Sequence, residues 1–209
     1  GAEVLAPVGP ADAAAGDLAH AQVHALHAGR EHEDLEHGLG QGQLGQLLAL
    51  DLEENPNHPF VLFNVGMTAF YLGEFTEAIH YLQASIAVSD SAESHLRKAY
   101  ALLVAAKQHL DDISGALVDL NTGLKTFPDD PELQFRRGLL KSAVGDLNAA
   151  REAYEAVLGV NTNGHLSSID TGILSFKTQH NLASVYDGLD NYPRARDLWQ
   201  QAHRDEPGG

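Results

Sequence analysis

The sequence predicts an all-α protein, built as a right-handed superhelical solenoid of four helix pairs with one further helix in front of them. Its 209 residues are rich in Ala and Leu and modest in β-branched and aromatic residues, which favours helices over sheets. A pattern of small and large apolar residues also recurs, aligned on Ala78, Ala116, Ala150 and Ala195. These alanines lie 38, 34 and 45 residues apart, and such periods are typical of stacked helix pairs.

The helix in front of the repeats is preceded by residues 1–43, a His-, Gly- and Ala-rich segment that we expect to be loosely ordered. Glycines recur from residue 38 onward and disfavour a stable helix there. We expect a helix from about Leu44 that ends before Pro56, because the residue before a proline avoids the helical conformation. Residues 44–209 then form one repeat domain, with helix pairs at about 59–90, 97–130, 131–162 and 176–209.

Two insertions interrupt the repeat. The first adds four residues within 89–94, and the second is assigned to residues 163–175. The second insertion is polar and contains glycine, so we expect a surface loop beside the last helix pair. It is either a tolerated insertion or a segment that covers part of a binding groove or docks a neighbouring domain.

The repeated residues resemble the tetratricopeptide-repeat family. The third pair carries Gly138, Gly145, Ala150 and Tyr154, and the fourth carries Leu182, Ala183, Tyr186, Ala195 and Trp199, at the spacing of that motif. Three departures are Val104 in place of a small residue, and Asp111 and Asp190 in place of the turn glycine. The resemblance implies the solenoid fold, with a concave groove lined by the first helix of each pair.

Composition and charge exclude several classes of function. There is no cysteine, which removes disulfides, thiolate metal sites and thiol nucleophiles. A formal net charge of −16 repels nucleic acid and anionic membrane surfaces. No apolar run approaches the roughly 20 residues that span a bilayer, and no signal peptide is evident, so we expect a cytoplasmic protein without membrane insertion.

No catalytic motif is found, so we expect neither an enzyme nor a bound cofactor. The phosphate-binding loop, the serine-hydrolase elbow and the zinc-protease motif are all absent from the sequence. The paired acids at 111–112 and 129–130 fall at turns between helices, where Asp serves as a helix cap.

Three histidines have the spacing of a metal site on one helical face: His20, His24 and His27. Their segment is weakly helical and glycine-flanked, so ordering it around a metal costs entropy. We therefore expect solvated histidines and no metal site, and keep these three as the weak candidates.

The concave groove is the remaining candidate site. Carrying over the groove positions of tetratricopeptide repeats gives the following residues: Phe60, Phe63, Asn64, Met67, Phe70, Tyr71, Lys98, Gln108, Phe135, Arg136, Lys177, His180, Asn181 and Ser184. One end of this set is aromatic and the other carries Lys98, Arg136 and Lys177, which suits a protein or peptide partner, expected to be acidic. The alternative is that the helix near 44–52 already covers the aromatic end. The carboxylate-clamp pattern of chaperone-binding repeats is absent.

Residues 44–207 also resemble the region that follows the catalytic domain in many bacterial family 2 glycosyltransferases. The stretch SSIDTGILSFKTQHNLA carries most of this likeness. We therefore predict a non-catalytic scaffold that binds a protein or peptide in its groove. The alternative is an accessory module, for acceptor docking or assembly, of a glycosyltransferase whose catalytic domain would belong to a longer parent protein.

Overall fold

The computed structural model describes residues 41–160 and 170–206, and within these ranges every element is helical. The α-helices are α2 (Gln41–Glu54), α3 (Pro59–Tyr71), α4 (Phe75–Val88), α5 (Leu96–His109), α6 (Ile113–Thr126), α7 (Pro131–Ala143), α8 (Leu147–Leu158), α9 (Phe176–Gly188) and α10 (Tyr192–Asp205). A short 3-10 helix, η2 (Thr171–Leu174), precedes α9. In the described ranges, no helix is long and apolar enough to cross a membrane.

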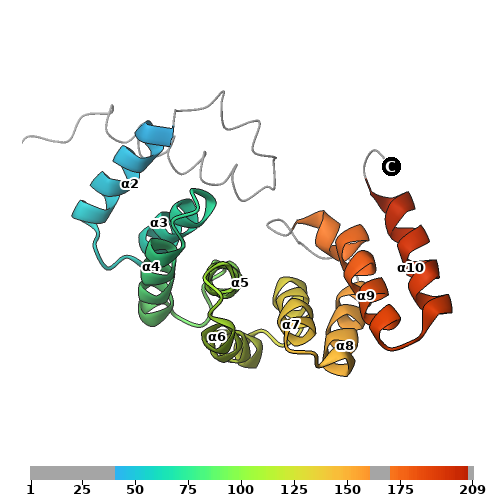
Figure 1. Ribbon diagram of the computed structural model, residues 1–209. Helices are drawn as coiled ribbons and strands as arrows, with labels where there is room; N and C mark the ends of the chain where they lie inside the picture. Colours follow the sequence, from blue (N-terminus) through green and yellow to red (C-terminus); the bar gives the residue numbers. More distant parts are fainter. Residues whose placement is uncertain (1–40, 161–169, 207–209) are drawn as a thin grey trace, which may run out of the picture.

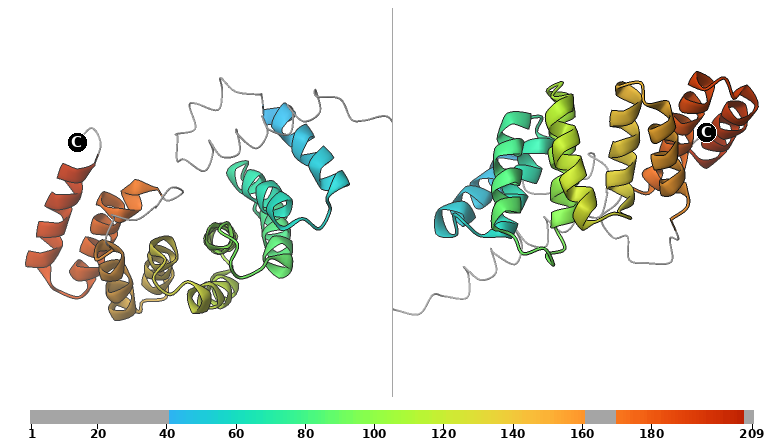
Figure 2. Two further views of the ribbon diagram at one scale, coloured as in Figure 1. Left: turned by 180° about the vertical axis from the view of Figure 1, so that it is seen from behind. Right: turned by 90° about the horizontal axis from the view of Figure 1, so that it is seen from below.

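The helices form four antiparallel pairs stacked along an arc. Helices α3, α5, α7 and α9 line its inner side, and α4, α6 and α8 lie behind them (Figure 1). The second view in Figure 2 shows the same pairs side by side along the arc. Helix α2 packs on α3 at one end, and α10 lies at the other end. The predicted class, an all-α solenoid of helix pairs with one preceding helix, is confirmed.

The core is a chain of clusters between neighbouring pairs. The four aligned alanines are fully buried, which lets the two helices of each pair approach closely. Three apolar clusters follow one another along the arc, each built from one pair and the first helix of the next, and the last of them also includes Ile173 of η2 and Leu198 of α10. Each pair is therefore stabilised mainly by its immediate neighbours.

The turn within each helix pair requires one residue in the left-handed backbone conformation, with positive φ. Gly73 and Gly145 fill this position with φ of 80° and 78°. Asp111 and Asp190 take it in the second and fourth pairs, with φ of 58° and 60°. Asp is one of the few residues besides Gly that tolerates this conformation, so the two departures from the motif leave the turn intact.

Acidic residues cap several helix starts, as predicted. The carboxylate of Asp112 accepts a hydrogen bond from the backbone N–H of Gly115. Asp130 accepts one from Leu133 in the same way, at 3.0 Å. Burial raises the pKa of the Asp130 carboxyl above its ordinary value. These carboxylates satisfy backbone donors that the helix itself leaves free.

The start of the predicted domain and its second insertion differ in detail from the structure. Helix α2 begins at Gln41, a turn earlier than expected. Residues 1–40, with His20, His24 and His27, lie outside the described residues, as do 161–169 of the second insertion. The described part of that insertion is an ordered turn, because Gly172 and Ile173 are buried and Ile173 belongs to the third pair's apolar cluster.

Candidate functional site

The predicted groove residues fall into two groups, buried and accessible. On α3, the side chains of Phe63, Asn64 and Met67 are buried, and only Tyr71 is openly exposed. Helix α5 covers them, since the ring of Phe63 lies 5.1 Å from that of His95 and both Phe63 and Met67 share a cluster with Leu102. The aromatic side chains that we expected on the surface of the groove therefore belong mainly to the core. Helix α5, the first helix of the next pair, buries them, in addition to any contact with α2.

The second pair offers little open surface. Ala101, Leu102 and Ala105 of α5 are buried, and Gln108 is half-buried. His109 is exposed, but its ring stacks on Phe75 with centroids 4.3 Å apart. The accessible charged and polar side chains of the predicted groove are therefore concentrated on α7 and α9.

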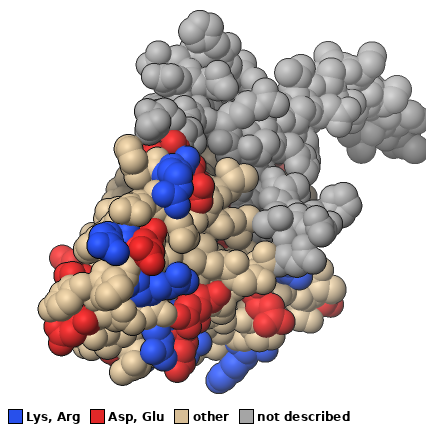
Figure 3. All heavy atoms as spheres, turned by 90° about the vertical axis from the view of Figure 1, so that its right-hand side faces the viewer, with Lys and Arg blue, Asp and Glu red and all other residues tan. Residues whose placement is uncertain are grey.

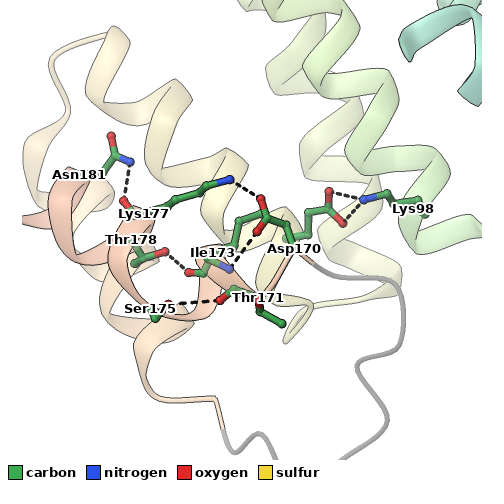
Figure 4. Close-up of polar contacts among 10 residues, drawn as sticks. Lys98, Asp170, Thr171, Ile173, Ser175, Lys177, Thr178 and Asn181 are labelled. Carbon is green, nitrogen blue, oxygen red and sulfur yellow. Dashed lines mark hydrogen bonds and ion pairs between the residues drawn. The ribbon is translucent and has the colours of Figure 1, made fainter. Parts of the chain in front are cut away.

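Two of the three predicted groove cations are already paired with carboxylates. The Lys98 ammonium donates to both carboxylate oxygens of Glu132, at 2.8 and 3.0 Å. Lys98 and Glu132 occupy the same position in successive repeats, so this ion pair ties α5 to α7. Lys177 donates to Asp170, which belongs to the described end of the second insertion (Figure 4). The groove is therefore less basic than the sequence predicted.

Arg136 is the exception among these cations. Within the described ranges no ion pair or hydrogen bond ends on its side chain, and its Nε is buried without a partner. Burial lowers the pKa of the Arg136 guanidinium, while the negative charges of Glu132 and Asp170 oppose the shift. An arginine remains protonated under these conditions, so an unpaired cation lies on the inner face.

The first helix of the fourth pair presents polar groups. His180 and Ser184 are exposed on α9. Asn181 is half-buried, and its side-chain amide donates to the Lys177 carbonyl at 2.8 Å (Figure 4). Thr178 is buried and donates to the Ile173 carbonyl, which fastens the insertion to the start of α9.

Sequence reasoning missed the pairing of the groove cations. Glu132 lies one repeat of 34 residues after Lys98, and this spacing is a signal that could have predicted the pair. Asp170 comes from an insertion that lies outside the repeat, so no repeat position predicts where its side chain lies. In the described ranges no group of three or more potential metal-ligating side chains is brought together.

Comparison with protein families identifies two of the four pairs. Residues 131–163 and 177–205 each match a tetratricopeptide-repeat family model. The third and fourth predicted tetratricopeptide repeats are thereby confirmed. A search of curated protein sequences finds no significant match.

Solved structures of similar fold cover most of the chain. A crystal structure of MamA aligns with a TM-score of 0.60 at 18% identity, over 96% of this chain and 95% of that one. BtubC from P. vanneervenii aligns with a TM-score of 0.70 at 16% identity, over 92% and 85%. The APC/C hetero-tetramer Cut9–Hcn1 aligns with a TM-score of 0.66 at 17% identity, over 78% of this chain and 30% of that chain. At these identities the likeness supports the fold alone.

Proposed function

We propose that this chain of tetratricopeptide repeats is a non-catalytic scaffold that binds a protein or peptide on its concave face. The observation that carries the proposal is that Arg136, on helix α7 of the inner side of the arc (Figure 1), has a guanidinium without a partner among the described residues. Burying a cation without a partner is unfavourable, so a ligand that supplies a carboxylate there gains a charge-assisted hydrogen bond.

The other side chains of the inner face limit which kinds of ligand fit this proposal. Lys98 and Lys177 already hold carboxylates, so they add less attraction for an acidic partner than their number suggests. The ligand therefore needs one well-placed acid near Arg136 and polar groups that reach His180 and Ser184. An extended or helical peptide satisfies this pattern better than a uniformly acidic surface. One of the proteins of similar fold, Cut9, is seen in a complex with another protein chain, which is in line with such a role.

The proposal is tested by affinity capture from a lysate of the source organism, with the captured proteins quantified by mass spectrometry. Arg136→Gln removes the unpaired cation and is expected to reduce recovery of a specific partner roughly tenfold, because hydrogen bonds between charged groups are the stronger ones. Lys125→Gln removes one positive charge from the exposed surface of α6 on the outer layer, and serves as the matched control.

Three results are informative once circular dichroism shows that both variants fold. Selective loss with Arg136→Gln supports the concave face and an acidic ligand. Equal recovery with all three proteins excludes Arg136 as an anchor. Equal loss with both variants shows that overall charge, and not the groove, drives capture.

A second proposal rests on the glycosyltransferase resemblance of residues 44–207. In it, the solenoid is an accessory module for acceptor docking or assembly in a longer parent protein. The stretch that carries most of the resemblance spans the described end of the insertion and the first half of α9, and this end of the insertion packs against α7, α8 and α9. The coding sequence of the natural protein tests this proposal directly: an adjoining catalytic domain supports it, and an open reading frame without one contradicts it.

A further inference from the structure

Large apolar side chains recur at the turn inside each helix pair. The C-cap residue of the inner helix is Leu72, Leu110, Val144 or Leu189. The first three are exposed by 45%, 47% and 51%, and Leu189 is half-buried. The outer helix begins three positions later with Phe75, Ile113, Leu147 or Tyr192, of which Tyr192 is exposed and the others are half-buried. Each turn therefore combines two apolar side chains, one of them openly exposed.

The four turns lie along one edge of the arc, because the inner helices run in the same direction. At the start of α5, the ring of His95 lies 5.8 Å from that of Phe60 at the start of α3. The ion pair of Lys98 with Glu132 shows that α5 and α7 also begin side by side. The right-hand view of Figure 2 shows the pairs side by side along the arc. We call the four turns, residues 72–75, 110–113, 144–147 and 189–192, the turn edge.

The charge of the turn edge is negative in every turn. Its acidic residues are Glu74, Asp111, Asp112, Asp146 and Asp190, all exposed, and the four turns contain no lysine or arginine. Within the described ranges only Asp146 among these acids forms an ion pair, with Lys141 at 3.1 Å. The turn edge is therefore a row of accessible apolar side chains with negative charge beside it that other groups of the described chain leave largely uncompensated.

The end of the solenoid at α10 has a different surface. On this helix the basic Arg194, Arg196 and Arg204 lie among the acidic Asp197 and Asp205. Figure 3 faces that end of the molecule and shows basic and acidic side chains interleaved with uncharged surface. The turn edge differs from this end because it combines one sign of charge with a regular row of apolar side chains.

The charge of the turn edge selects among its possible occupants. A second copy of the chain has a formal net charge of −16, so contact between two turn edges brings like charges together. Residues 1–40 contain seven acidic residues and one arginine, so the edge repels this segment as well. A partner with positive charge is attracted instead, and apolar side chains on that partner gain by covering the exposed row.

The spacing of the turns favours a helical partner. Helix α5 packs directly on α3 and on α7, and the axes of helices in contact lie about 8–10 Å apart. Seven residues of an α-helix advance by about 10.5 Å and return to nearly the same face. A helix with an aliphatic residue at every seventh position therefore places one such side chain beside each of Leu72, Leu110 and Val144.

We propose that the turn edge binds an amphipathic α-helix of a partner protein, with aliphatic residues at every seventh position and Lys or Arg beside them. The aliphatic side chains pack on the exposed row and remove it from water. The basic side chains face the acids of the turns, Glu74 and Asp111 among them. This surface is separate from the inner face that contains Arg136, so the proposal does not depend on ligand binding there.

The probe is a fluorescently labelled synthetic peptide of about 22 residues, long enough to have helical character in water. It has Leu at every seventh position, Lys at the flanking positions and Ala elsewhere. A second peptide of the same composition distributes the leucines around the helix. We expect the first peptide to bind the full chain saturably, as measured by fluorescence anisotropy, and roughly tenfold more tightly than the second, because only its leucines meet the row together.

Variants of the protein test the apolar and the charged part of the edge separately. Leu110→Gln is expected to weaken binding roughly fivefold, whereas Val118→Gln, at a position exposed by 65% on the outer helix α6, leaves it unchanged. Asp111→Asn removes a charge and keeps the turn, because Asn also tolerates the left-handed conformation. It is expected to weaken binding about two- to threefold at low salt. Asp129→Asn, exposed in the connection between α6 and α7, is its control.

Several outcomes would overturn the proposal once circular dichroism shows that the variants fold. They are the absence of saturable binding, equal binding of the two peptides, and equal effects of either edge variant and its control. Loss of peptide binding in Arg136→Gln would place the helix on the concave face. Self-association of the free protein that Leu110→Gln abolishes, measured by sedimentation, would assign the edge to a second copy.

Discussion

At the scale of single residues, burial and pairing decide what each polar group on the inner face can do. Lys98 and Arg136 were equal candidates in the sequence, yet Glu132 holds Lys98 while Arg136 has no such partner among the described residues. The same contrast separates His180, which is exposed, from His95, which is buried between the first two pairs. Residue type alone therefore does not distinguish a binding group from a structural one.

His95 has a structural role, which its hydrogen bonds define. The hydroxyls of Ser85 and Ser89 donate to the carbonyls of Pro59 and Ser85. They are thus acceptors toward His95 Nε2, at 3.3 and 3.0 Å, and on the other side of the ring Nδ1 lies 3.4 Å from the Glu93 carboxylate. This network joins α3, α4 and the start of α5 across the first insertion.

The network makes stability depend on pH. Burial lowers the pKa of His95, against the opposing charge of Glu93. The unfolded chain then binds a proton at this position more tightly than the folded protein. The free energy of unfolding is expected to fall as the pH drops below the ordinary histidine value of 6.5. Urea unfolding at pH 7.5 and 5.5 measures this, and His95→Gln is expected to reduce the difference in unfolding free energy between the two pH values. An unchanged difference would show that another group causes the pH dependence.

At the scale of elements, the apolar repeat could predict the helices but not which neighbour covers each face. The aligned alanines and the turn residues Asp111 and Asp190 behave as the pattern indicates. Phe63 and Met67 do not, because groove positions of one repeat also face the first helix of the next. The sequence pattern of one helix cannot predict which of its faces the next helix pair covers. The turn formed by η2 could not be predicted either, since its sequence follows no repeat.

The close approach of α7 and α8 gives a test at this scale. A Cβ atom on Gly138 would lie 2.3 Å from Cε1 of Tyr154, whose side chain is fully buried. Gly138→Ala must displace that ring and is expected to destabilise the protein by about 1–3 kcal/mol, as overpacking of a core does. Gly159→Ala is the matched control, because its nearest contacts are 3.4 Å or longer. Denaturant unfolding compares the two, and equal stability would show that the ring adjusts without cost.

At the scale of the whole molecule, the solenoid is an arc whose inner side, outer side and two ends have different contacts. Three core clusters run along it, so each helix pair is stabilised by its successive neighbours, and α3, α5, α7 and α9 form the inner side of the arc (Figure 1). The likeness to MamA and BtubC extends over nearly the full chain, but it concerns this arrangement only. The ligand that we propose is argued instead from the accessible groups of α7 and α9.

The central claim is that a partner binds the inner side of the arc. Site-specific photo-crosslinking tests it most directly, with a benzophenone side chain at Tyr71 or at Val118. Tyr71 is exposed at the end of α3, and its position lies near enough to Arg136 to affect the guanidinium electrostatically, whereas Val118 is exposed on α6 of the outer layer. We expect cross-links to a captured partner from position 71 and none from position 118. Cross-links from position 118 alone would contradict binding on the concave face.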